Sequence, residues 1–88
     1  MTTILGTVTG PSGEPVAEAS VYFVEGPVPL PDIAQLTDDE GRFRLAAPVP
    51  GTYRLGARAP GCEAAEVTVE VGGEAEVAAS LTLPATPP

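Results

Sequence analysis

The chain has 88 residues, of which 43% are hydrophobic, and its 12 acidic side chains outnumber four arginines, for a net charge of −8. This length holds one domain with a single small core. The negative charge repels phosphate, so no nucleic acid and no anionic membrane is expected as a partner. The chain contains no histidine, which excludes a histidine-based catalytic site.

The chain as it stands shows no signal for export or crosslinking. Its first residues form neither a basic region nor a long apolar run, so no signal peptide is expected, and no stretch reaches the length of a membrane span. The single cysteine, Cys62, cannot form a disulfide within the chain, and we expect a half-buried thiol at a turn. A cytoplasmic location follows, or secretion if the chain is a piece of a longer secreted protein.

Alternating apolar and polar residues, bounded by glycine and proline, predict seven β-strands and no helix. The expected strands cover residues 2–9, 19–25, 34–37, 42–46, 52–59, 63–71 and 74–83. The Gly72-Gly73 pair between the last two predicts a two-residue hairpin. We therefore expect an all-β fold, a seven-stranded antiparallel β-sandwich spanning residues 1–83. Residues 84–88 are expected to form a disordered proline-rich tail.

A polar turn at residues 38–41, with the sequence Asp-Asp-Glu-Gly, leads directly into one of these strands. Gly41 can supply the positive φ that a tight reversal needs. Phe43 follows and alternates with Arg42 and Arg44, which predicts that Phe43 lies in the core. The turn's carboxylates are potential Ca²⁺ ligands, but they are consecutive in sequence, so we interpret the segment as a solvated turn with no metal.

The order of these features resembles the carboxypeptidase regulatory-like domain over about residues 4–83. The resemblance is carried by Ile4, Gly6, Val8, Gly13, Pro15, Val16, Ala19, Val21, the 37–43 segment, Gly51, Thr52, Tyr53, Leu55 and Ala59-Pro60-Gly61. It implies a prealbumin-like (transthyretin-like) Greek-key sandwich that serves as an accessory module of enzymes, receptors or surface proteins. Two departures are Cys62, where an aromatic residue is usual, and a long proline-rich connection at residues 26–33.

The connection at residues 26–33 is the main candidate for a binding surface. Its alternating prolines restrict the free chain, so binding would cost less ordering entropy. Its apolar side chains either contact a partner or fold back and close the open end of the sandwich; both interpretations stay open. The expected partner-binding residues are Pro27, Val28, Pro29, Leu30, Pro31 and Ile33.

The four arginines are expected on the outer faces of two strands. There they pair with outward acids such as Glu66 and Glu70, or they recognise an acidic partner. The residues are Arg42, Arg44, Arg54 and Arg58.

The sequence thus predicts a non-catalytic module that contacts another protein, associates with itself or forms a structural part of a larger assembly. No cofactor and no metal are expected. The alternative function is binding of a small ligand or carbohydrate, for which exposed aromatic rings are usual, and only Tyr22 is expected to point outward. An enzyme ranks third because no paired carboxylates stand out in an apolar setting.

Overall fold

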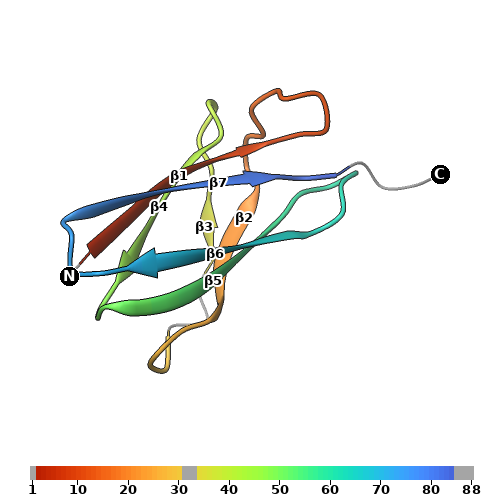
Figure 1. The fold of residues 1–88 in the computed structure, drawn as a ribbon. Helices are drawn as coiled ribbons and strands as arrows, with labels where there is room; N and C mark the ends of the chain where they lie inside the picture. The colour runs from red at the N-terminus through yellow and green to blue at the C-terminus, as the bar shows by residue number, and fades with distance from the viewer. Residues whose placement is uncertain (1, 31–33, 85–88) are drawn as a thin grey trace.

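The computed structural model describes residues 2–30 and 34–84 (Figure 1). The strands are β1 (Thr2–Thr9), β2 (Ser20–Glu25), β3 (Gln35–Leu36), β4 (Arg42–Ala47), β5 (Gly51–Arg58), β6 (Ala65–Val71) and β7 (Glu76–Thr82). The all-β prediction is confirmed, with every strand end within two residues of its expected place. In the described part of the chain, no helix is long and apolar enough to cross a membrane.

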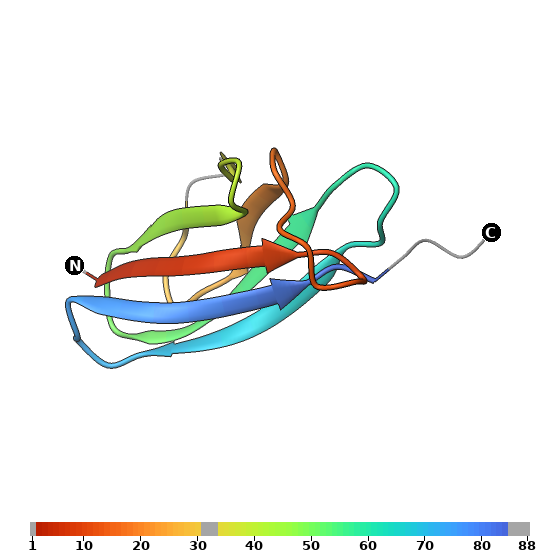
Figure 2. The same cartoon turned by 90° about the horizontal axis from the view of Figure 1, so that it is seen from above.

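The strands form two sheets that pack as a sandwich (Figures 1 and 2). Sheet A has the order β4-β1-β7, and sheet B has the order β3-β2-β5-β6. All pairs are antiparallel, as predicted, except β1 and β7, which run parallel. These two strands are the first and the last of the chain, so no short turn forces them into opposite directions.

The Gly72-Gly73 connection is a corner between the sheets. Strands β6 and β7 lie in different sheets, so the predicted hairpin, which requires paired neighbours, is wrong. Gly73 has a φ of 100°, and the Glu74 carboxylate accepts the N–H of Gly72 at 2.6 Å. The glycine pair correctly marks a reversal, but a local signal does not say which sheet receives the next strand.

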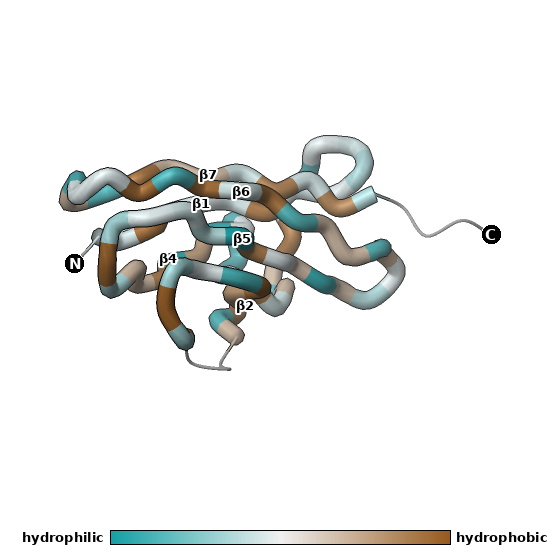
Figure 3. Tube along the Cα trace, turned by 60° about the horizontal axis from the view of Figure 1, so that its bottom comes forward, coloured by the Kyte–Doolittle hydropathy of each residue, from teal (hydrophilic) through white to brown (hydrophobic). Residues whose placement is uncertain are grey.

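The inward faces of the two sheets form one apolar core. Apolar and polar residues alternate along the strands, as Figure 3 shows along the chain trace, and this period of two places every second side chain inside. Phe43 is 5% exposed and Tyr53 is fully buried, so the prediction that Phe43 belongs to the core is confirmed. The other buried apolar residues are Ile4, Val8, Ala19, Val21, Leu45, Ala47, Leu55, Ala57, Val69, Val71, Leu81 and Leu83.

Gly6 of β1 makes room for Phe43 of β4, its cross-strand partner. A Cβ at Gly6 would lie 2.4 Å from Cζ of Phe43 and 2.5 Å from the carbonyl oxygen of Ala79 on β7. The ring can move only at the expense of core packing, and the oxygen belongs to the backbone. The three strands of sheet A therefore meet at a position that only glycine fits.

The structure describes only the first residue of the proline-rich tail. The carbonyl of Pro84 accepts a hydrogen bond from the N–H of Glu63 at 3.0 Å. This bond ties the end of β7 to the bend that follows β5. Residues 85–88, for which disorder was expected, lie outside the described residues.

Candidate functional site

The connection after β2 holds the four described members of the expected binding site. Pro27 lies on the backbone of Gly51, since a Cβ there would be 2.7 Å from Cγ of Pro27. Leu30 is half-buried and packs against the core. Pro27, Val28 and Pro29 are exposed. Leu30 thus anchors the segment in the core, Pro27 rests on Gly51 from the outside, and Val28 and Pro29 face solvent.

The remaining two expected site residues, Pro31 and Ile33, lie outside the described residues. Val24 at the end of β2 joins Val28 instead, with 39% and 36% of their surfaces exposed. Both line a hollow of about 340 Å³ at this end of the sandwich. The alternation in β2 predicts an outward Val24, but only the bulge between Phe23 and Glu25 and the path of the loop bring it beside Val28.

Of the two arginines of sheet B, Arg54 is paired with acids, whereas Arg58 forms no ion pair with any described residue. Arg54 lies 3.6 Å from Glu25 and 3.9 Å from Glu66, in line with the cross-strand pairing expected for Glu66. Glu70 instead accepts the hydroxyl of Thr52 at 2.9 and 2.8 Å. Exposed pairs of this kind contribute about 0–1 kcal/mol each, so they position side chains more than they stabilise the fold.

The turn before β4 is held by Asp38. Its Oδ1 accepts the N–H groups of Glu40 and Arg42, each at 2.9 Å, and its own N–H donates to the Arg42 carbonyl at 3.0 Å. Gly41 has a φ of 75°, as predicted for this reversal. The hydrogen bond from the Arg42 N–H, helped by that from Glu40 and by the Arg42 charge, lowers the pKa of Asp38 below its usual 3.8.

This lowered pKa predicts that the Asp38 turn weakens in acid. A carboxyl group with a lower pKa in the folded chain stabilises the fold above its unfolded pKa and loses that contribution as pH falls through the folded pKa. We expect wild type to melt above Asp38→Ala at pH 6, with the difference shrinking below about pH 4. Thermal melts of both proteins from pH 6 to pH 2 measure this difference in melting temperature. A constant difference across this range would assign the effect to something other than the carboxylate charge.

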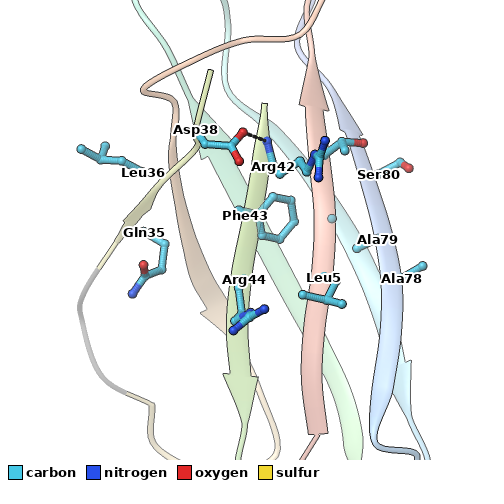
Figure 4. A pocket seen from close by; sticks show the side chains of 12 residues that line it. Leu5, Gln35, Leu36, Asp38, Arg42, Phe43, Arg44, Ala78, Ala79 and Ser80 are labelled. Atoms are coloured by element: carbon cyan, nitrogen blue, oxygen red, sulfur yellow. Dashed lines mark hydrogen bonds between the residues drawn. The ribbon is translucent and has the colours of Figure 1, made fainter. Parts of the chain in front are cut away.

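A second, larger hollow of about 720 Å³ lies along sheet A and its β4 edge. It is lined by residues of β3, β4, β1 and β7 (Figure 4). Arg42 and Arg44 of β4 both line it and are exposed. Sequence reasoning found the two arginines and their outward direction but not the hollow, because its far wall, β3, comes from the other sheet.

The described residues that bear catalytic or metal-binding groups are dispersed. They include no cluster of three or more cysteine, aspartate and glutamate side chains suited to a metal ion. Cys62 is half-buried against the core at the bend after β5, where its N–H donates to the Ala59 carbonyl at 3.3 Å. The two hollows described above offer room for a partner.

Comparison with known proteins identifies relatives of this fold. The chain is 40% identical over 73 residues to bacillopeptidase F of Bacillus subtilis, a match that covers 82% of this chain and 5% of that protein. Its fold resembles a chain in the crystal structure of a type II cohesin–X-dockerin complex from Acetivibrio cellulolyticus, with a TM-score of 0.65 and 18% identity. That similarity covers 94% of this chain and 57% of the other. At 18% identity it shows a shared fold and nothing further.

The family match is the more specific finding. Residues 3–83 match the carboxypeptidase regulatory-like domain, and this range includes all of residues 4–83, over which the sequence features resemble that family. Apart from Thr2, it contains all seven strands. The chain therefore belongs to the carboxypeptidase regulatory-like domain family.

Proposed function

We propose that the chain is a non-catalytic β-sandwich module that binds another protein. Its family membership and its match to a small part of a much longer relative support an accessory role. The neighbour in fold was solved within a protein complex, which agrees with a role in protein contact. The fold supplies a rigid frame, and such frames commonly carry function on their loops.

The observation that carries this proposal is the apolar end of the sandwich around Val24 and Val28. Both are exposed and line the same hollow, while Pro27 and Leu30 hold the loop in place. A loop that is already ordered loses less entropy on binding. Apolar side chains gathered around a concave surface favour a protein partner.

A catalytic role finds no support among the described side chains. The chain has no histidine, and Asp38, Glu70 and Glu74 are engaged by backbone N–H groups or a threonine hydroxyl. Carbohydrate binding is also less well supported. The ring of Tyr22 rests on Gly56, where a Cβ would be 2.6 Å from Cε2, and Tyr22 lines neither hollow.

The test is co-purification with defined surface variants. The chain is immobilised, and proteins retained from an extract of its own cells are identified by mass spectrometry after crosslinking. We expect the variant Val24→Ser/Val28→Ser to lose the specific partner at least tenfold while melting within a few degrees of wild type, because both side chains are exposed.

The matched control is Leu36→Ser, which removes an apolar side chain that is 64% exposed on β3 and lines the other hollow. It should retain the partner. Capture that is unchanged in the double variant would contradict the loop as the contact surface. A double variant that unfolds would show instead that the two valines serve the core.

A further inference from the structure

Sheet A stops one strand short of covering sheet B. Sheet A has three strands and sheet B has four. Gln35 of β3 pairs with Val21 of β2, and cross-strand partners point to the same face. Val21 is fully buried, yet Gln35 is exposed, so no described strand lies over it. Figure 4 shows Gln35 in the space between β3 and β4.

The backbone of β4 faces this space with groups that can bond another strand. The Gly41 carbonyl accepts the Val8 N–H of β1 at 2.7 Å, whereas the N–H and C=O of Arg42 both bond to Asp38 on the other side. Because successive residues of a strand direct these groups to opposite sides, Arg44 and Ala46 direct theirs away from β1. No described strand pairs with β4 on that side.

The edge carries two cations, Arg42 and Arg44, beside the acidic turn at residues 38–40. Arg42 pairs with Glu40, but Arg44 forms no ion pair with any described residue. The neighbour of Arg44 across the β1–β4 ladder is Leu5, which offers no charge. Arg44 is thus the cation of this open edge that has no acidic partner among the described residues.

We infer that the open edge of β4 takes an extended acidic segment of a partner protein as a fourth strand of sheet A. The added strand would bond to the N–H and C=O groups of Arg44 and Ala46, the mode known as strand addition. Its residue opposite Arg44 lies on the outer face, where a carboxylate meets the guanidinium. The residues on either side of it point inward beside Phe43 and Leu45, so they are apolar.

A second copy of this chain is a poorer occupant than an acidic segment. Antiparallel pairing of β4 with β4 centred on Arg44 places the two Arg44 side chains opposite each other, and like charges across a ladder destabilise it. Charge complementarity therefore selects an acidic strand from another protein.

This inference rests on the proposed function only in assuming a protein partner, and it concerns a different surface. The probe is the peptide acetyl-Thr-Val-Glu-Val-Thr-amide, titrated into the ¹⁵N-labelled chain at low salt and followed by NMR. We expect the largest shifts at the amides of residues 42–47, and slower hydrogen exchange at Arg44 and Ala46. Arg44→Glu should weaken binding about fivefold, and a peptide with Lys in place of Glu should restore binding to that variant.

Proline variants test whether the backbone edge itself is used. Ala46→Pro removes an N–H that faces the open edge, where proline is tolerated, and should abolish binding while the chain stays folded. The matched control is Ala78→Pro on β7. The carbonyl of Ala75 and the N–H of Leu83 both bond to β1. Successive residues of a strand direct their backbone groups to opposite sides, so the groups of Ala78, three residues from Ala75 and five from Leu83, face the other open edge of sheet A. The Ala78→Pro variant should therefore bind the peptide as wild type does.

Equal binding by wild type and Ala46→Pro, or shifts confined to residues 24–30, would overturn the inference. If the peptide did not bind but partner capture still depended on Val24 and Val28, the inference would be overturned and the proposed function would stand. Dimers of the chain that are lost in Ala46→Pro, measured by analytical ultracentrifugation, would make a second copy the occupant and would also overturn the inference.

Discussion

Replacing Phe43 with alanine is expected to lower the free energy of unfolding by about 3–5 kcal/mol. The ring is 5% exposed and fills the space left by Gly6 between β4 and β1. Its removal loses the transfer free energy of the ring and leaves a cavity that neighbouring strands, fixed by their ladders, cannot close. The total free energy of unfolding of a small domain is about 5–15 kcal/mol, so the expected loss is a large fraction of the stability. Urea unfolding of both proteins measures it.

The control for Phe43→Ala is Arg44→Ala, one position along the same strand and exposed. It should change the free energy of unfolding by no more than about 0.5 kcal/mol. Similar losses in the two variants would show that Phe43 is not inside the sandwich. Gly6→Ala adds a further check, because part of its cost should disappear when Phe43 is also alanine, while the contact with the Ala79 carbonyl remains.

Much of the fold follows from local signals in the sequence. The period of two identifies the strands, because it is fixed by the backbone and repeated in each of them. Asp38 and Gly41 identify the turn before β4, because a side-chain cap and a positive φ are properties of single residues. The same reasoning placed Phe43 inside and the four arginines outside, and the structure confirms all of these positions.

What the sequence did not predict depends on partners distant in the chain. The parallel pairing of β1 with β7 and the corner at Gly72-Gly73 follow from which sheet each strand joins, and alternation carries no information on that choice. The uncovered side of β3 was missed for the same reason. It exists because sheet A has one strand fewer than sheet B, and no single segment of the sequence predicts how many strands each sheet contains.

In the proline-rich connection, the sequence also did not predict which apolar side chains are buried. Val28 and Leu30 stand two residues apart between prolines and look alike in sequence, yet Val28 is exposed and Leu30 packs against the core. The difference arises from the neighbours, since Leu30 reaches Gly26 and would lie 2.6 Å from a Cβ there. One loop therefore combines a side chain that closes the sandwich with one that is exposed to solvent.

Replacing Tyr53 with alanine is the second change with a large expected effect, again about 3–5 kcal/mol of unfolding free energy. Tyr53 is fully buried, and its ring lies 5.5 Å from that of Phe23, centroid to centroid. Its hydroxyl donates to the Val49 carbonyl at 2.5 Å and accepts the Val49 N–H at 3.2 Å. One side chain thus fills the core and fixes the connection between β4 and β5.

Tyr53→Phe separates these two contributions, because it keeps the ring and removes only the hydroxyl. We expect a loss of about 1–2 kcal/mol, since the Val49 backbone groups lose a partner in a half-buried position. Urea unfolding of both variants gives the two values, and amide exchange at Val49 should quicken in Tyr53→Phe. If Tyr53→Phe cost as much as Tyr53→Ala, the corner hydrogen bonds and not the packing of the ring would hold this part of the fold, and the Phe23 contact would contribute little.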